Sequence, residues 1–162
     1  MRPPGRLPPD TRIYAIGDIH GRADLLADTI SRIDGDIRRR PVGHAVEVYL
    51  GDYIDRGPQS KDVIDCLMKL SWPGWTMTFL RGNHEQAMLD FAGDAGAYRI
   101  WRGFGADETL RSYGVTPPRS DDDEALAAAR EAFLLACPKS HLRFLNRLCY
   151  SRVVGDYMFV HA

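Results

Sequence analysis

The chain lacks the features of secreted, membrane-spanning and polyanion-binding proteins. Its 162 residues include only three cysteines, an odd number without the spacing of a zinc site, so we expect buried, reduced thiols in a cytoplasmic protein. The longest apolar run, residues 132–137, is far too short to cross a bilayer, and no membrane partner is expected. Because 21 Lys and Arg balance 22 Asp and Glu, the net charge of −1 does not predict binding to nucleic acid.

Beyond these absences, the order of strand and helix patterns is typical of an α/β domain. We expect a proline-rich leader at residues 1–12 and one domain over residues 13–162. Apolar segments that predict strands alternate with segments of helical spacing. The expected strands are 13–16, 45–50 and 76–80, and the expected helices are 23–39, one that runs from an N-cap at Ser60 to about Leu70, and 83–91. This alternation predicts a parallel sheet wrapped by helices.

The remaining residues predict a helical cover and a hairpin. The glycine-rich, aromatic segment 93–114 is expected to form short helices and loops over the site, and helices should follow at 125–136 and after Pro138. Residues 150–154 and 157–160 predict two strands joined at Gly155 and Asp156, a pair typical of a hairpin turn. We expect 157–160 to be a buried strand whose end lies beside the ends of the others.

Metal-binding side chains follow each of the three expected parallel strands. Asp18 and His20 come directly after the first strand, Asp52 after the second and Asn83 after the third. The carboxyl ends of parallel strands meet at one edge of a sheet, and the spacing of about 30 residues is that of one strand-helix-strand unit. In an extended backbone Asp18 and His20 point to the same side, so both can reach one cation. Two divalent metals roughly 3.5–4 Å apart can hold a hydroxide between them and clamp a phosphate.

Each of these residues has an ordinary explanation when taken alone. Asp and Asn after a strand are common turn formers and helix caps. A lone histidine at a strand end, such as His161, is usually structural, and Arg56 alone would be an ordinary ion-pair partner of Asp52 or Asp55. Three glycine-flanked segments in the same register, two of them with a histidine, favour a metal site instead.

These segments also resemble a known family. Residues 17–21 (GDIHG), 51–57 (GDYIDRG) and 82–85 (GNHE) are similar to the motifs of the phosphoprotein phosphatase (PPP) family of serine/threonine phosphatases, within the calcineurin-like metallophosphoesterases. Residues 159–162 (FVHA) resemble the start of that family's next metal-ligand motif. Residues 109–114 and 141–145 resemble stretches of its compact bacterial members.

The resemblance implies a fold, an activity and cofactors. The fold is α/β, a metallophosphoesterase-type β-sheet core wrapped by helices, with four α/β/β/α layers in the full family. The activity is hydrolysis of phosphoric monoesters, with a phosphoprotein or a small phosphoester as substrate. The implied nucleophile is a hydroxide held by two divalent metals, which attacks phosphorus in line without a phosphoenzyme. Manganese is the first candidate, and the mixed Asp, His and Asn donors also suit iron or zinc.

The roles of the metal ligands carry over by position. Asp18, His20 and Asp52 would hold one metal. Asp52 would bridge to a second metal, which Asn83 and His161 would also hold.

The catalytic roles carry over in the same way. His84 would protonate the departing alkoxide while Asp55 holds it, and a histidine suits this role because its pKa lies near neutrality. Arg56 would bind the phosphate with its planar fork of donors, and Asn83 would also contact the substrate. Glu85 would lie behind the metal ligands.

The resemblance breaks at the carboxyl terminus. Family members continue past the position of Ala162 with further strands, another histidine ligand for the second metal and a second phosphate-binding arginine. We therefore expect that the C-terminal part of the domain is missing here. Weak or absent turnover is expected for these 162 residues, and activity for a longer parent.

Two alternative functions stay open. A symmetrical dinucleoside tetraphosphatase is built on a similar site, although the Asp55-Arg56 pair looks more like the protein phosphatases. A catalytically impaired fragment, or a metal-binding scaffold, is favoured by the truncation and disfavoured by the intact set of His84, Asp55 and Arg56. A nuclease of the wider group is disfavoured because no basic groove is visible in the sequence.

Overall fold

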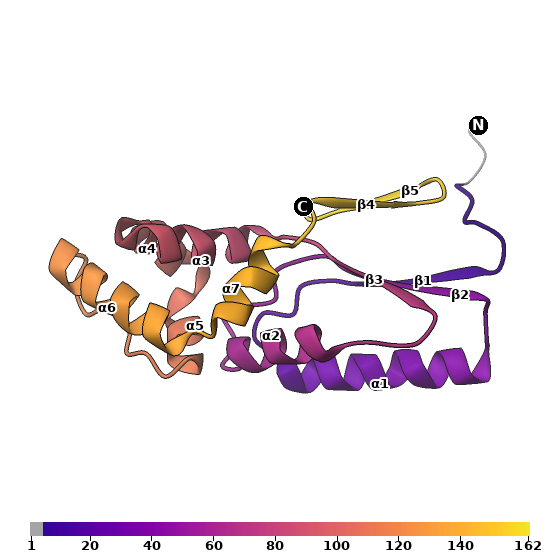
Figure 1. Cartoon of the computed structure of the whole chain (residues 1–162), viewed down its shortest axis with the longest axis horizontal. Coiled ribbons are helices and arrows are strands. Elements are labelled where there is room, and N and C mark those ends of the chain that lie inside the picture. Colours follow the sequence, from indigo (N-terminus) through magenta and orange to yellow (C-terminus); the bar gives the residue numbers. More distant parts are fainter. Residues whose placement is uncertain (1–4) are drawn as a thin grey trace.

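The computed structural model describes residues 5–162, so residues 1–4 of the proline-rich leader lie outside the described residues. A parallel sheet in the order β1-β2-β3 is formed by β1 (Thr11–Ile16), β2 (His44–Tyr49) and β3 (Trp75–Phe79). The crossover helices α1 (Ala23–Arg39) and α2 (Ser60–Lys69) lie on the same side of this sheet (Figure 1). The predicted parallel α/β sheet is confirmed, with β1 starting two residues earlier than expected.

The central strand β2 is buried on both of its faces. Residues 45–49 are all buried, a continuous run that is typical of a parallel strand covered on both sides. Tyr49 belongs to the main core, the large cluster of buried apolar side chains that also contains Val63 and Ile64 of α2. Val46 and Val48 belong to a smaller cluster on the other face, together with Leu80 and Val154.

The start of α2 differs from the prediction. Ser60 is the first residue of the helix, and Gln59 occupies the cap position without a capping side-chain bond. The Ser60 hydroxyl accepts the backbone N–H of Asp55 instead, at 3.0 Å. The predicted N-cap at Ser60 is therefore wrong, because a buried backbone donor in the preceding loop takes its oxygen.

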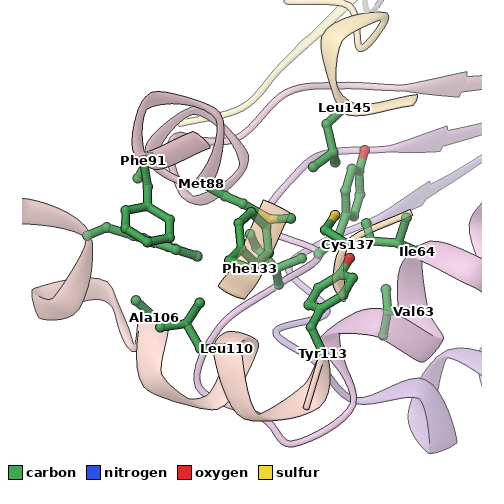
Figure 2. Close-up of a cluster of buried hydrophobic side chains, with 14 of the residues drawn as sticks. Val63, Ile64, Met88, Phe91, Ala106, Leu110, Tyr113, Phe133, Cys137 and Leu145 are labelled. Atoms are coloured by element: carbon green, nitrogen blue, oxygen red, sulfur yellow. The ribbon is translucent and has the colours of Figure 1, made fainter. Parts of the chain in front are cut away.

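The helices after β3 gather beyond the carboxyl ends of the strands (Figure 1). Their buried side chains belong to the main core, in which Phe91 and Phe133 pack with ring centroids 5.7 Å apart (Figure 2). The predicted helical cover over this end is confirmed. Its elements are α3 (Asn83–Gly93), η1 (Ala95–Ala97), α4 (Tyr98–Trp101), η2 (Arg102–Phe104), α5 (Ala106–Ser112), α6 (Asp123–Ala136) and α7 (Lys139–Asn146).

The last two strands form an antiparallel hairpin, β4 (Ser151–Val154) and β5 (Tyr157–Val160), on the face of the sheet opposite α1 and α2 (Figure 1). The hairpin follows a parallel bridge between Leu80 and Cys149. The prediction of a buried strand at 157–160 is wrong, because Tyr157, Met158 and Val160 are 43%, 65% and 45% exposed. Only Phe159 packs against the smaller cluster, so one side chain of this strand reaches the core.

The described part of the leader pairs with the turn of this hairpin. The backbone N–H of Arg6 donates to the Asp156 carboxylate, and the N–H of Asp156 donates to the carbonyl of Arg6, both at 3.0 Å. The Tyr157 hydroxyl donates to the carbonyl of Gly5, also at 3.0 Å. Residues at the two ends of the described chain therefore hold each other.

The three cysteines differ in how far they are buried. Cys137 is buried and Cys66 half-buried, whereas Cys149 is exposed, so the prediction of three buried thiols is wrong for Cys149. Burial raises the pKa of the Cys137 thiol to about 11.

Among residues 5–162, no helix has the length and apolar character needed to cross a membrane.

Candidate active site

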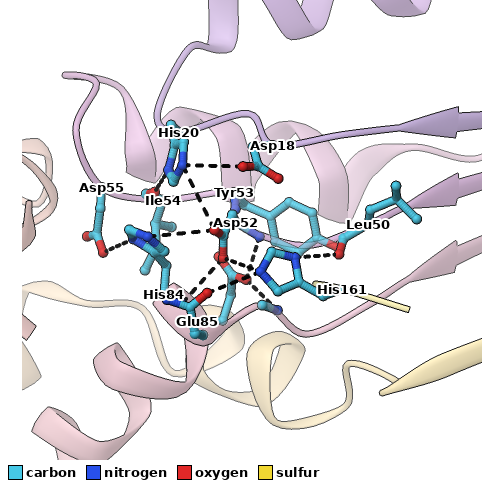
Figure 3. A network of polar contacts seen from close by, with 12 residues as sticks. Asp18, His20, Leu50, Asp52, Tyr53, Ile54, Asp55, His84, Glu85 and His161 are labelled. Atoms are coloured by element: carbon cyan, nitrogen blue, oxygen red, sulfur yellow. Dashed lines mark hydrogen bonds and ion pairs between the residues drawn. The ribbon is translucent and has the colours of Figure 1, made fainter. Parts of the chain in front are cut away.

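The loops after β1 and β2 are joined where the two strands end (Figure 3). The backbone N–H groups of Ile19 and His20 both donate to the carbonyl of Asp52, at 2.9 Å. His20 has a φ of 44°, so this loop is a left-handed turn and not the extended backbone we expected. The expected convergence still occurs, because Asp18 Oδ2 lies 3.7 Å from His20 Nε2.

Asp52 lies at the centre of the polar cluster (Figure 3). Its Oδ2 is 3.9 Å from Nε2 of His20 and 3.6 Å from Nε2 of His84. Its Oδ1 is 3.3 Å from Nε2 of His161. Three imidazoles therefore surround one nearly buried carboxylate. The backbone of Asp52 has a φ of 55°, a conformation that few residues other than glycine adopt.

Backbone carbonyls fix the orientation of two of these imidazoles. Nδ1 of His20 lies 2.9 Å from the carbonyl oxygen of Ile54, and Nδ1 of His161 lies 3.0 Å from that of Leu50. Since a carbonyl can only accept, each Nδ1 carries a proton, and in the neutral imidazole each Nε2 then presents a lone pair. This is the arrangement of metal-ligating histidines, whose second nitrogen is held by a carbonyl or carboxylate.

Two atoms of the cluster lack a suitable partner unless a cation is present. Nε2 of His20 is buried and has no hydrogen-bond partner within residues 5–162. Nε2 of His161 lies 3.1 Å from Oδ1 of Asn83, and in the neutral imidazole both of these atoms are acceptors. The donor atoms therefore fit a positive ion better than they fit each other.

The donors form two sets that share Asp52. One set is His20, Asp52 and His84, and the other is Asp18, Asp52 and His161; within each, the donor atoms lie within 4.8 Å of one another. In the described part of the chain, neither Asp18 nor Asp52 has a Lys or Arg partner within 4 Å. Oxygen and imidazole donors of this kind suit divalent manganese, iron or zinc.

His84 forms a buried pair with Asp55. Its Nδ1 lies 2.7 Å from Asp55 Oδ2, and its side chain is 2% exposed. Burial lowers the pKa of His84. The hydrogen bond to Asp55 and the negative charges of Asp52 and Asp55 outweigh burial, so the pKa is raised above its ordinary value. These contacts stabilise the imidazolium form, which is able to donate a proton from Nε2.

Three further residues form hydrogen bonds with Asp55, and the sequence did not predict any of them as part of the site. The Trp101 indole N–H donates to Asp55 Oδ2 at 2.8 Å, and the Thr109 hydroxyl donates to Oδ1 at 2.6 Å. The backbone N–H of Asp55 in turn donates to the hydroxyls of Thr109 and Ser60, at 2.9 and 3.0 Å. No spacing in the sequence links these residues, because they come from α2, α4 and α5.

Glu85 connects the loop after β2 to the loop after β3 from the interior of the protein. Its fully buried carboxylate accepts the backbone N–H groups of Asp52, Tyr53 and Gly82, at 2.9, 2.7 and 2.9 Å. Burial raises the pKa of Glu85 to about 7, against the lowering effect of these hydrogen bonds. A Cβ at Gly82 would overlap the Asp52 carboxylate, which is why glycine is required there.

Arg56 and Asn83 lie at the exposed side of the site. Arg56 has a φ of 64°, and its backbone N–H faces the carbonyl of Gly105 at 3.4 Å. Its side chain is exposed, and within residues 5–162 it forms no ion pair with Asp52 or Asp55. The ordinary ion-pair explanation for Arg56 therefore has no support in this geometry.

Two curated relatives are named as serine/threonine phosphatases. A candidate serine/threonine-protein phosphatase of Schizosaccharomyces pombe is 39% identical over 106 residues, which are 64% of this chain and 29% of that protein. Serine/threonine-protein phosphatase 1 of Salmonella typhimurium is 37% identical over 78 residues, which are 48% of this chain and 32% of that protein. The matched region is thus less than a third of each relative.

The fold and the family follow from two further comparisons. The crystal structure of a candidate diadenosine tetraphosphatase superposes with a TM-score of 0.55 at 17% identity, over 93% of this chain and 49% of that chain, and so shares the fold. The family model described as calcineurin-like phosphoesterase matches residues 11–148, a range that contains all three glycine-flanked segments. The chain belongs to the calcineurin-like phosphoesterase family.

Proposed function

We propose that this chain carries the metal site of a phosphoric monoester hydrolase that acts on phosphoserine or phosphothreonine in proteins. The observation that carries the proposal is the convergence of three imidazole Nε2 atoms on the two oxygens of Asp52. Carbonyl groups orient two of the three imidazoles so that a lone pair faces the cluster. This orientation is typical of metal-ligating histidines.

The proposed metal ligands are Asp18, His20, Asp52, Asn83 and His161. Two divalent ions, with manganese as the first candidate, supply an activated water as nucleophile and neutralise charge on the phosphate when bound. The protein's contribution is to hold the donors in place before any ion arrives. The carbonyls of Ile54 and Leu50 do this for the imidazoles, and Glu85 does it for the backbone of Asp52.

The proposed proton donor is His84. A serine or threonine alkoxide is a poor leaving group, so its departure needs a proton from a group of suitable pKa. Asp55 holds Nδ1 of His84 and favours the imidazolium, and Nε2 is directed toward the metal-ligand cluster at 3.6 Å from Asp52. The same Nε2 also belongs to one of the two donor sets, so a role of His84 as a metal ligand is chemically available.

The proposed phosphate-binding residues are Arg56 and Asn83. The exposed guanidinium of Arg56 is free of ion pairs within residues 5–162 and can bind two phosphate oxygens at once. The exposed side chain of Asn83 can offer its amide N–H to the substrate while its oxygen faces His161. Protein phosphoserine and phosphothreonine are favoured because curated relatives of the chain are named as serine/threonine phosphatases.

Metal-dependent turnover tests the proposal. The chain is treated with a chelator, reloaded with Mn²⁺ and assayed on a phosphoserine peptide and on diadenosine tetraphosphate. Because weak turnover at most is expected for these 162 residues, we expect slow hydrolysis of the peptide that requires metal and is lost in Asp52→Asn. Asp28→Asn, an exposed aspartate on α1, serves as the matched control and should keep full activity. Preference for the dinucleotide would favour a dinucleoside tetraphosphatase over a protein phosphatase. Metal binding without any turnover would favour the catalytically impaired fragment or the metal-binding scaffold.

A second experiment separates the two roles of His84. If His84 is the proton donor, His84→Asn should keep Mn²⁺ affinity and lose about 10²–10⁴-fold in turnover of the phosphopeptide. The loss should be much smaller for a nitrophenyl ester, whose leaving group hardly needs a proton. A large fall in Mn²⁺ affinity would instead assign His84 as a ligand.

A further inference from the structure

We infer that Trp101 and Thr109 are positioning residues that fix the carboxylate of Asp55 and, through it, the imidazole of His84. The inference rests on the proposed role of His84 as proton donor. Thr109 begins one of the stretches that resemble compact bacterial members of the family, but no sequence pattern gives it or Trp101 a role at the site. Both come from the helical cover rather than from the strand ends.

The Asp55 carboxylate is enclosed by neutral donors and one imidazole. Oδ2 accepts from Nδ1 of His84 at 2.7 Å and from the Trp101 indole at 2.8 Å, while Oδ1 accepts from the Thr109 hydroxyl at 2.6 Å. Asp55, Trp101 and Thr109 are all fully buried. In the described chain no Lys or Arg pairs with this carboxylate, so these hydrogen bonds alone replace the water it has lost.

Thr109 also fixes the backbone from which the carboxylate projects. Its hydroxyl oxygen accepts the N–H of Asp55 at 2.9 Å and lies 2.9 Å from the Ser60 hydroxyl. Asp55 has a φ of 70°, a conformation that costs free energy and persists only where contacts hold it. One hydroxyl therefore sets both the main chain and the side chain of Asp55.

Trp101 is in turn held by the cover. Its ring packs against Phe91 at 5.3 Å, Phe133 at 6.4 Å and Tyr98 at 6.5 Å between centroids. These partners come from α3, α6 and α4. Because an indole in such a close-packed group cannot turn, its N–H is a fixed donor to Asp55.

The two residues act through His84 and touch neither the phosphate site nor the metal ligands. With both of its oxygens occupied, the Asp55 carboxylate can hold Nδ1 of His84 in only one direction. Nε2 then stays directed at the Asp52 cluster. Loss of either donor should therefore weaken proton donation and leave metal binding unchanged.

The test compares substrates with different leaving groups. Trp101→Phe keeps an aromatic ring without the N–H, Thr109→Val keeps the shape without the hydroxyl, and Thr109→Ser restores it. Tyr98→Phe, on the same helix as Trp101, is the matched control. It removes a hydroxyl that bonds to Asp107 and not to Asp55. We expect the first two variants to lose about 10- to 100-fold in turnover of a phosphoserine peptide and much less with a nitrophenyl ester. Thr109→Ser should restore most of the loss.

A spectroscopic readout works whether or not the chain turns over substrate. The proton between Nδ1 of His84 and Asp55 should give a strongly downfield NMR resonance, assigned by its absence in His84→Asn. We expect this resonance to be shifted or lost in Trp101→Phe and Thr109→Val, and to be unchanged in Tyr98→Phe. An unchanged resonance in both variants would overturn the inference even if catalysis is absent. Equal losses on both substrates, matched by Tyr98→Phe, would also overturn it and show a role in folding alone.

Discussion

Nδ1 of His161 lies 3.0 Å from the carbonyl oxygen of Leu50, although 111 positions separate the two residues. Leu50 follows β2 and His161 follows β5, so this hydrogen bond joins the hairpin to the end of the central strand. It turns Nε2 of His161 toward Asp52 and Asn83. The second donor set therefore depends on how the hairpin packs on the sheet.

Removal of His161 should affect only one of the two proposed metals. We expect His161→Ala to bind one Mn²⁺ with nearly unchanged affinity and the other at least about tenfold more weakly. Asp52→Asn should weaken both, because Asp52 belongs to both donor sets. Calorimetric titration of the chelated chain measures this. His44→Ala, an exposed histidine at the start of β2, is the control, and a two-ion isotherm unchanged in His161→Ala would contradict the assignment.

Glu85 should be essential to the stability of the site. Glu85→Ala leaves three buried backbone N–H groups without an acceptor, each worth about 1–3 kcal/mol. We expect the free energy of unfolding to fall by about 3 kcal/mol or more, with loss of metal affinity. Urea unfolding measures the change, and Glu131→Ala on the exposed face of α6 is the control. Equal stability of the two variants would show that these hydrogen bonds are dispensable.

Arg56 should matter for substrate and not for folding. Since its side chain is exposed, Arg56→Ala should leave the melting temperature unchanged. Loss of a charge-assisted, bidentate contact with phosphate should lower kcat/KM by about 10- to 100-fold. Arg56→Lys should restore only part of the activity, because an ammonium cannot form the paired contact. A marked loss of stability without a kinetic effect would favour a structural role.

The three thiols should react at very different rates in the folded chain. Cys149 is exposed, whereas Cys137 is buried with its pKa raised to about 11. Since the thiolate is the reactive form, we expect an alkylating reagent at mildly alkaline pH to modify Cys149 first and Cys137 only on unfolding. Mass spectrometry of the alkylated peptides identifies the order. Rapid modification of Cys137 in the native chain would show that α6 does not pack as described.

The strand ends could be predicted from the sequence, because the geometry of a parallel sheet brings them together. Asp18, Asp52 and Asn83 each follow an apolar strand, and the structure places them at one edge. The left-handed turn at His20 was not predicted. It depends on hydrogen bonds to the carbonyl of Asp52, a contact between two loops that no local pattern records.

The support of Asp55 could not be predicted, for a related reason. Trp101 and Thr109 are 46 and 54 positions from Asp55, on short helices without strong periodicity. The exposure of the hairpin was also misjudged, because apolar residues at 157–160 do not reveal how many of them find a partner. Local pattern predicts which residues end a strand, whereas tertiary packing decides which distant side chains hold them.

The position of bound metal tests the central claim most directly. Crystals of the chain soaked in Mn²⁺ can be measured at a wavelength where manganese scatters anomalously. The account predicts two anomalous peaks on either side of the Asp52 carboxylate, one near His20 and one near His161. Peaks elsewhere on the molecule, with the Asp52 cluster empty, would contradict it.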